Sequence, residues 1–355
     1  MTLLSVCVTG TGGGGFGEQI AKALRCARNR YRLIGTDTSL ISSGAELADT
    51  FLRLPPARDP GYISELLTVC REHQIKALFP GSEPEMLKIS QHRDQFLAEE
   101  IFLPINPDAV IRLCLDKVSL SKRLVELGFE IPDFRRVGSL QDIEGFDCYP
   151  MVLKPSVGSG GSSDVFIAQT ANERDWYARY LLGLYPEFIA QQYVGTPDDE
   201  YTVGVLTGMD GQFVNSIVLR RQISSALSCR LKVPNRTGRT ELGQTLVISS
   251  GISQGEIGHY PAIAEASEAI AQSLGARGSI NIQCRFANGK VYLFEINPRF
   301  SGTTSLRALA GYNEPDVLIR KHLLGEHIAP RFPYQQGIVL RRLHEVFFPS
   351  QSGAI

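Results

Sequence analysis

The residues with the clearest potential for chemistry lie in two apolar-rich runs near the end of the chain. Gln283 and Arg285 belong to the first run, and Glu295 and Asn297 belong to the second, with the dipeptide Asn288-Gly289 between them. Asn-Gly between two such runs predicts a β-hairpin. Because side chains alternate along a strand, Gln283 and Arg285 should share one face of the first strand, and Glu295 and Asn297 one face of the second.

Such a face suits a metal ion that is bound together with phosphate. Magnesium prefers hard oxygen ligands and completes its shell with water and substrate phosphates, so one carboxylate with amide oxygens suffices. Gln283, Glu295 and Asn297 would supply these oxygens, and the carboxylate of Glu295 can bridge two ions. Arg299 presents a planar fork of donors that fits a phosphoryl oxygen. We therefore expect Mg²⁺ at this hairpin, as two ions, with Mn²⁺ as an alternative metal.

A glycine-rich run, Gly10 to Gly17, lies near the start of the chain. It contains the spacing Gly12-x-Gly14-x-x-Gly17, and Asp37 ends the next apolar run. This spacing is typical of a dinucleotide site, in which glycines allow close backbone approach and a helix N-terminus attracts phosphate. The same glycines would also let a strand turn sharply into its helix. The chain has no Tyr-x-x-x-Lys pair and no Gly-Lys-Ser or Gly-Lys-Thr loop. An NAD(P)-dependent oxidoreductase stays open as an alternative.

Composition limits the classes of function. The chain has 355 residues, 43% of them hydrophobic and 21% charged, with a formal net charge of -1. This charge lacks the basic excess of a nucleic-acid binder, and no apolar run reaches the roughly 18 residues needed to cross a bilayer. The seven cysteines are scattered without a C-x-x-C pair, which indicates reduced packing residues. We expect a cytoplasmic protein that binds neither nucleic acid nor membrane, and a homodimer is compatible with this composition.

The elements that would position these residues follow from local patterns. Alternating strand and helix patterns in residues 1–113 predict a doubly wound parallel sheet. After residue 113 the pattern changes, and an apolar strand runs into a glycine- and serine-rich loop that begins at residue 156. The expected strands are 4–9, 31–35, 77–79, 149–155, 165–168, 214–219, 279–286 and 291–296, and the expected helices are 18–28, 63–73, 116–128 and 262–274.

The series Gln283, Glu295, Asn297 and Arg299, with its continuation from Ser301 to Tyr312, resembles the metal and phosphate motif of the ATP-grasp superfamily. The likeness extends over residues 116–325 and is greatest to the carbamoyl-phosphate-synthetase-like branch, while the glycine-rich start is similar to the preATP-grasp domain. It implies an α/β fold, α+β in the ATP-grasp part, with a two-lobed ATP-grasp fold after the N-terminal sheet. The implied domains are 1–113 (preATP-grasp), 114–194 (small lobe with a glycine-rich flap) and 195–355 (large lobe with the metal site).

The resemblance also implies which residues hold ATP. Lys154 and Lys117 match two basic residues that contact nucleotide phosphate, and the loop 156–163 matches the flap whose backbone amides close over phosphates. The segment 191–194 matches the hinge that reads adenine, and Glu200 matches the acid that holds ribose hydroxyls. The implied ATP-binding residues are Lys117, Lys154, Ser156, Gly158, Ser159, Gly160, Gly161, Gln192, Tyr193, Val194 and Glu200.

Three positions depart from the family pattern. Gln192 stands where many relatives have Glu, and Gln283 stands where many ligases have an acid, which lowers the negative charge offered to metal. Gly302 stands where carbamoyl-phosphate enzymes have Arg, which makes bicarbonate a poor substrate candidate.

The implied activity is an ATP-dependent carboxylate–amine or carboxylate–thiol ligase that forms an acyl phosphate and releases ADP and phosphate. Lys154 and Arg299 would offset the developing charge, and Arg220 and Arg221 are candidates for gripping the carboxylate or the acyl phosphate. We expect small carboxylate and amine substrates, with amino acids among the candidates. A non-catalytic nucleotide-binding protein stays open as a further alternative. The expected substrate-binding residues are Gly12, Gly13, Gly14, Glu83, Arg220, Ser301 and Gly302.

Overall fold

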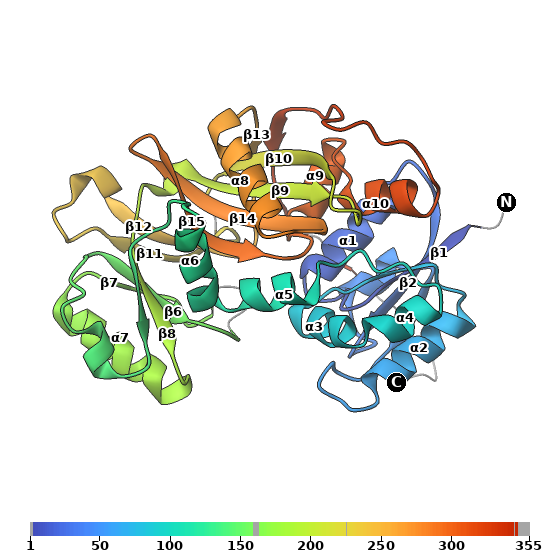
Figure 1. The fold of residues 1–355 in the computed structure, drawn as a ribbon, viewed down its shortest axis with the longest axis horizontal. Helices are drawn as coiled ribbons and strands as arrows, with labels where there is room; N and C mark the ends of the chain where they lie inside the picture. Colours follow the sequence, from blue (N-terminus) through green and yellow to red (C-terminus); the bar gives the residue numbers. More distant parts are fainter. Residues whose placement is uncertain (1–2, 159–162, 225, 344, 347–355) are drawn as a thin grey trace. The chain divides into compact units, whose positions relative to one another are not determined.

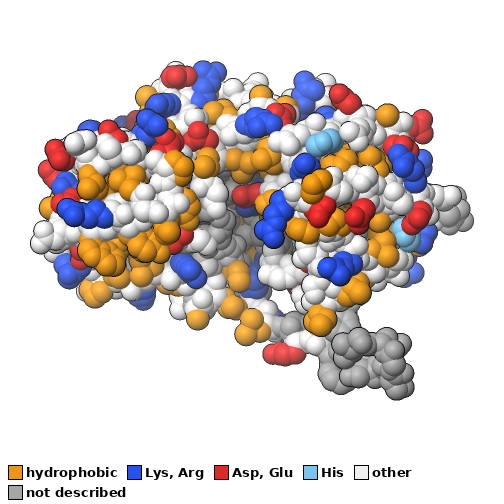
Figure 2. Space-filling view, turned by 90° about the horizontal axis from the view of Figure 1, so that it is seen from below, with side chains coloured by type: hydrophobic (Ala, Val, Ile, Leu, Met, Phe, Trp, Pro, Cys, Tyr) orange, Lys and Arg blue, Asp and Glu red, His pale blue; other side chains and the backbone are white. Residues whose placement is uncertain are grey.

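A computed structural model describes residues 3–158, 163–224, 226–343 and 345–346. The chain separates into two compact units (Figure 1). The first comprises the described residues up to Leu103 together with those from Leu340 onward, and the second runs from Pro104 to Val339. On the face shown in Figure 2, the described acidic and basic side chains are interspersed with apolar ones.

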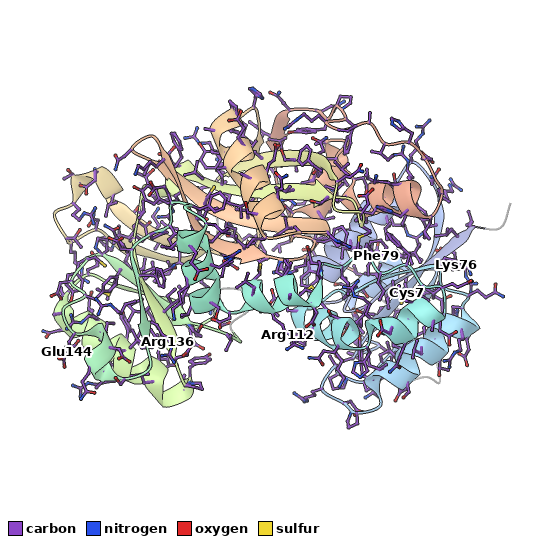
Figure 3. The ribbon with its side chains drawn as sticks, in the orientation of Figure 1. Cys7, Lys76, Phe79, Arg112, Arg136 and Glu144 are labelled. Carbon is purple, nitrogen blue, oxygen red and sulfur yellow. The ribbon has the colours of Figure 1, made fainter. Side chains whose placement is uncertain are left out.

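The first unit is built on a parallel sheet of order β3-β2-β1-β4. Strand β1 is apolar except for Ser5, and Cys7 on β1 and Phe79 on β4 are fully buried (Figure 3). Strands covered on both faces read as continuous apolar runs, which is the pattern of this segment. The strands are β1 (Leu4–Val8), β2 (Tyr31–Asp37), β3 (Thr50–Arg53) and β4 (Ala77–Phe79), and the helices are α1 (Phe16–Arg25), α2 (Tyr62–Glu72), α3 (Glu83–Gln91) and α4 (Arg93–Ala98).

Two glycines allow β1 and β4 to turn into their helices side by side. A Cβ on Gly81 would lie 1.8 Å from the Thr9 carbonyl oxygen, and one on Gly17 would lie 2.3 Å from that of Gly10. The Gly17 amide donates to the Gly81 carbonyl oxygen at 3.2 Å. The glycine-rich loop and the loop after β4 therefore meet at the carboxyl edge of the sheet, as expected for ligand loops of an α/β fold.

The second unit contains a four-stranded antiparallel sheet of order β5-β8-β6-β7. Helix α7 packs against it, with Ala178 and Leu181 buried among Met151, Leu153 and Phe188. The elements are β5 (Phe134–Val137), β6 (Met151–Pro155), β7 (Phe166–Ala168), α7 (Ala171–Leu184) and β8 (Phe188–Gln192).

The same unit contains a larger antiparallel sheet of order β15-β14-β9-β10-β13-β16 and a separate pair, β11-β12. Helix α8 covers the larger sheet, since Ile263 and Ile270 pack with Val203, Val218 and Ile282 in one core. The strands are β9 (Glu200–Thr207), β10 (Phe213–Arg221), β11 (Cys229–Pro234), β12 (Thr245–Ser249), β13 (Gly255–Ile257), β14 (Gly278–Ala287), β15 (Lys290–Asn297) and β16 (Gly337–Val339). The helices are α5 (Asp108–Leu115), α6 (Lys117–Glu126), α8 (Pro261–Ser273), α9 (Thr304–Leu309) and α10 (Glu314–His322).

The predicted fold class is confirmed: a parallel α/β sheet precedes a part built from antiparallel sheets and helices. The units divide at residues 103/104 instead of 113, because Val110 and Cys114 of α5 belong to the core of the second unit. The described residues after Val339 group with the first unit, although the sequence placed them in the large lobe. The division at residue 194 stays a prediction. Among the described residues, no helix combines the length and the apolar character needed to cross a bilayer.

Candidate functional site

The predicted hairpin forms, and it carries an irregularity that the sequence did not indicate. Asn288 and Gly289 both have positive φ, 50° and 75°, as a two-residue hairpin turn requires. Gln283 pairs with Glu295, but the next residue, Cys284, pairs with Leu293. Phe294 is therefore an extra residue in β15, which makes a β-bulge.

Lys154 lies against this bulge. Its Nζ donates to the Phe294 carbonyl oxygen at 2.9 Å and lies 5.9 Å from the centre of the Phe294 ring. The pKa of Lys154 is lowered to about 8, chiefly by burial; the charge of Glu295 opposes this lowering and the charge of Lys117 adds to it. The structure therefore brings Lys154 to the strand that carries Glu295, with the charge of Lys117 near Lys154.

The predicted metal and phosphate residues form one connected row. The side-chain Nδ2 of Asn297 donates to Glu295 Oε1 at 3.1 Å, and Arg299 Nη2 donates to Asn297 Oδ1 at 3.2 Å. Gln283 lies directly across from Glu295 in the ladder. The described residues contain no cluster of three His, Cys, Asp or Glu side chains suited to a metal. Any metal here would rest on one carboxylate with amide oxygens, which is a donor set that Mg²⁺ accepts.

Glu200 is held in a buried ion triad. Its side chain is 1% exposed and accepts from Arg221 Nη1 at 3.0 Å and from Arg285 Nη2 at 2.9 Å. Burial alone would raise the pKa of this carboxyl, but the guanidinium groups of Arg285 and Arg221 hold it below its ordinary value. The ring of Tyr193 lies 4.4 Å from the Arg285 guanidinium carbon. The role of Glu200 toward ribose stays a prediction, since both of its carboxylate oxygens already accept from arginine.

Arg220 and Arg221 are both candidates for the substrate carboxylate, and the structure separates their side chains. Arg220 and Arg221 alternate on β10, and the side chain of Arg221 is 2% exposed while that of Arg220 is 42% exposed. Arg221 Nη1 donates to Gln283 Oε1 at 3.3 Å, whereas Arg220 Nε donates to the Asp198 carbonyl oxygen. The structure therefore brings Arg221 to the metal row and does not bring Arg220 there. The preceding strand could have given this signal, because Arg221 shares its face with apolar Leu219.

In residues 191–194, which are predicted to read adenine, several backbone groups already form hydrogen bonds within the protein. The amide of Gln192 donates to the Asp133 carbonyl oxygen, and that of Tyr193 donates to the Pro150 carbonyl oxygen. The carbonyl oxygen of Val194 accepts from Arg285 Nη1 at 3.2 Å. Adenine recognition by this segment stays a prediction.

The start of the predicted flap is fixed to α6. Ser156 is fully buried, and its hydroxyl donates to Asp116 Oδ1 at 2.8 Å, while the Lys117 amide donates to the Ser156 carbonyl oxygen. Gly158 has a φ of 80°, a conformation that favours glycine. Ser159, Gly160 and Gly161 lie outside the described residues.

Ser301 and Gly302 lie in the tight turn before α9. The Ser301 hydroxyl accepts from the Thr303 amide at 3.1 Å, and the Ser301 amide donates to the Thr304 hydroxyl. A Cβ on Gly302 would lie 3.0 Å from the Gly251 carbonyl oxygen. This turn therefore packs close to the loop after β12, and its role toward substrate stays a prediction.

In the first unit, two backbone amides of the glycine-rich loop donate to carboxylates of β2 and α1. The Gly12 amide donates to Asp37 Oδ2 at 2.7 Å, and the Gly14 amide donates to Glu18 Oε2 at 2.9 Å. Anionic partners already take these two amides, so the loop offers an incoming anion less than its spacing indicated. Glu83 begins α3, and the neighbouring Ser82 caps that helix by accepting from the Glu85 amide. The predicted contacts of Gly12, Gly13, Gly14 and Glu83 with substrate stay predictions.

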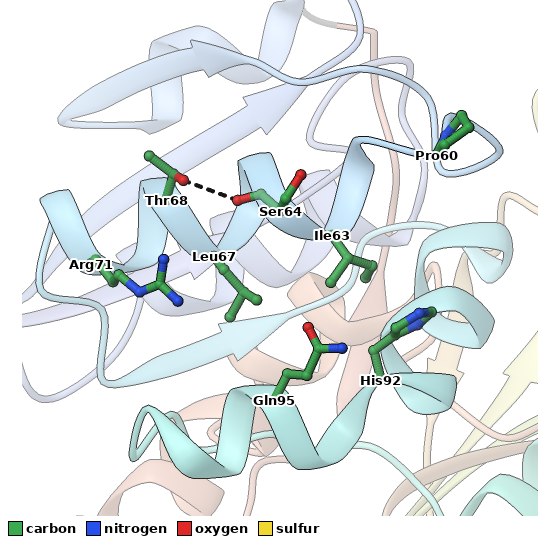
Figure 4. Close-up of a pocket in the computed structure, with 8 residues that line it drawn as sticks. All are labelled: Pro60, Ile63, Ser64, Leu67, Thr68, Arg71, His92 and Gln95. Atoms are coloured by element: carbon green, nitrogen blue, oxygen red, sulfur yellow. Dashed lines mark hydrogen bonds between the residues drawn. The ribbon is translucent and has the colours of Figure 1, made fainter.

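A shallow pocket in the first unit lies elsewhere, along α2 (Figure 4). It shares no residue with the glycine-rich loop, and Thr68 Oγ1 within it donates to the Ser64 carbonyl oxygen at 3.0 Å. The lining residues are Pro60, Ile63, Ser64, Leu67, Thr68, Arg71, His92 and Gln95.

The structure thus brings a buried lysine on one antiparallel sheet to the hairpin of a second sheet. Residues 185–346 match the family model described as ATP-grasp in the biosynthetic pathway with Ter operon, and residues 10–103 match the PylC-like N-terminal domain. Residues 185–346 are therefore of the ATP-grasp type.

The chain is also similar to several ligases and synthases. The carbamoyl phosphate synthase large chain of Thermoplasma volcanium is 22% identical over 307 residues, which are 83% of this chain and 27% of that protein. The D-alanine–D-alanine ligase of Thermotoga petrophila is 28% identical over 200 residues, 56% of this chain and 61% of that one. The solved L-amino acid ligase of Bacillus licheniformis has a TM-score of 0.66 at 16% identity, covering 93% of this chain and 78% of that one. The chain thus spans about a quarter of the length of the first of these relatives.

Proposed function

We propose that the protein is an ATP-dependent ligase that joins a small carboxylate to an amine through an acyl phosphate. The observation that carries this proposal is the contact of Lys154 Nζ with the carbonyl oxygen beside Glu295, at 2.9 Å. It joins a buried cation to a row of oxygen ligands and a guanidinium, which is what a metal-bound polyphosphate needs. The ATP-grasp type of residues 185–346 and the ligases among the relatives support the same activity.

In the proposed reaction, an oxygen of the substrate carboxylate attacks the γ-phosphorus of ATP, and the bond to the bridging oxygen of ADP breaks. The amine nitrogen then attacks the acyl carbon, and phosphate leaves. Lys154 and Arg299 would offset the negative charge that develops on the transferred group. This positioning and charge stabilisation asks little covalent chemistry of the protein itself.

Gln283, Glu295 and Asn297 are the residues that would hold Mg²⁺. They fit a hard cation, because Gln283 and Glu295 face each other across the ladder and Asn297 is hydrogen-bonded to Glu295. When bound, the ion would supply charge neutralisation along the phosphates. Lys117, Ser156 and Gly158 are proposed to meet the nucleotide beside Lys154.

The identity of the carboxylate and amine substrates is proposed from the relatives. D-alanine–D-alanine ligase and L-amino acid ligase are named for amino-acid substrates, and this supports amino acids as the first compounds to test. The oxidoreductase alternative is not favoured. Residues 10–103 match a PylC-like domain, and the loop amides of Gly12 and Gly14 are bound by Asp37 and Glu18.

The deciding experiment is release of ADP by the purified protein with ATP, Mg²⁺ and a panel of amino acids and other small carboxylates. We expect ADP and phosphate to appear in equal amounts when a carboxylate and an amine are both present. ADP release that ignores both compounds, or NADH binding with no ATP binding, would contradict the proposal.

A further inference from the structure

Arg221 is fixed beside the metal row by contacts on several sides. Its Nη1 donates to Glu200 at 3.0 Å, to the Ser249 hydroxyl at 2.8 Å and to Gln283 Oε1 at 3.3 Å. Its Nη2 donates to the Ser250 carbonyl oxygen at 2.7 Å and to that of Ile252 at 3.4 Å. A guanidinium held by so many acceptors cannot turn away when a ligand arrives.

The amide oxygen of Gln283 is therefore already engaged by a cation. Mg²⁺ binds oxygen at about 2.0–2.1 Å, so an ion on Gln283 would lie close to the fixed Arg221 guanidinium. Two cations that share one acceptor repel each other, and the repulsion is stronger beside a buried guanidinium than in bulk water. The charge of Glu295 also reaches Arg221, where it opposes the lowering of the arginine pKa by burial.

The charges around the row favour one divalent ion over two. Glu295 is the one carboxylate of the row, and Lys154 adds a second buried cation near it. Glu200 is neutralised by Arg221 and Arg285 together. Arg221 Nε is itself buried and, within the described part of the chain, has no hydrogen-bond partner. A buried donor without a partner indicates an acceptor that arrives with the ligand, such as a phosphate oxygen.

We propose that the Arg221 guanidinium takes the place of a second divalent cation, so that the nucleotide site binds one metal ion, on Glu295. This inference rests on the proposed function, and it replaces the expectation of two ions. Arg221 then acts as a fixed counter-charge for phosphate. The inference also revises the metal assignment proposed above, because Gln283 would orient the Arg221 guanidinium instead of binding the ion.

The test counts metal ions. Wild-type protein is titrated with Mn²⁺ in the presence of a non-hydrolysable ATP analogue, and bound Mn²⁺ is obtained from the electron paramagnetic resonance signal of the free ion. We expect one Mn²⁺ for each bound analogue. We expect Arg221→Met to bind a second Mn²⁺, because Gln283 Oε1 is released, and Arg221→Lys to keep one. The matched control is Arg136→Met, which removes an exposed strand arginine paired with Glu187 and should leave the number at one (Figure 3).

Each outcome decides a separate question. Two Mn²⁺ for each analogue on the wild type would overturn the inference and leave the ligase proposal standing, and this measurement does not depend on the folding of any variant. A folded Arg221→Met that still binds one ion would show that Arg221 does not exclude the second. Failure of the wild type to bind the analogue at all would overturn the proposed function itself, and the inference with it.

Discussion

Replacement of Glu200 by Gln should destabilise the second unit strongly. The carboxylate accepts three hydrogen bonds, from Arg221 Nη1 at 3.0 Å and from Arg285 Nε and Nη2 at 3.1 and 2.9 Å. A glutamine keeps one acceptor oxygen and turns two N–H donors toward guanidinium donors. Removal of one partner from a buried ion pair costs about 3–5 kcal/mol, because the other charge stays buried without compensation.

The variant is compared with wild type by calorimetric unfolding at neutral pH. For a unit of this size the expected loss corresponds to a fall in Tm of about 10 °C. Glu187→Gln is the matched control, because Glu187 pairs with Arg136 in an exposed position and should contribute little. A loss below about 1 kcal/mol for Glu200→Gln would refute the view that the triad depends on this charge.

The same triad predicts a pH dependence of known sign. The folded-state pKa of Glu200 is lowered, so its contribution is fully present above the unfolded-state pKa near 4.3 and is lost as pH falls through the lower folded value. The difference in stability between wild type and Glu200→Gln should therefore shrink in acid. A difference that stays constant down to pH 3 would contradict the assigned direction.

Three further predictions concern the site and the first unit. Glu295→Gln should abolish Mg²⁺-dependent ADP release while the melting curve stays near wild type, and retained turnover would remove Glu295 from the metal row. Because the pKa of Lys154 is about 8, affinity for an ATP analogue should fall above pH 8, by up to about tenfold for each pH unit, as the charged form is lost. Lys154→Arg should remove this dependence in calorimetric titrations, and an unchanged slope would point to another group. Gly81→Ala should destabilise the first unit by about 1–3 kcal/mol, since its Cβ would overlap the Thr9 carbonyl, and a wild-type Tm would contradict that close approach.

The fold was predictable where local patterns determine it. The alternation of strands and helices predicted the parallel sheet, and Asn288-Gly289 predicted the hairpin that the structure confirms. The helix expected at 18–28 is observed at Phe16–Arg25, and the strand expected at 77–79 is observed at those residues. These elements carry their signal in adjacent residues, in a period or in a turn dipeptide.

The contacts between distant segments were not predictable in the same way. Arg221 and Arg285 reach Glu200 from strands that are 21 and 85 positions away along the chain. The bulge at Phe294 depends on register, which alternation does not encode. The carboxylates on the glycine-rich loop come from Asp37 and Glu18, and their direction depends on how β2 and α1 are placed.

The hydrogen bond from Lys154 to the Phe294 carbonyl has a consequence for the entropy of ligand binding. A lysine that is fixed in one conformation loses up to about 2 kcal/mol of rotamer freedom. Here that freedom is lost when the chain folds, because Nζ donates to a backbone carbonyl oxygen. If phosphate binds here as proposed, it would find the ammonium group already in place, and its binding would carry a smaller ordering cost than binding to a mobile surface lysine.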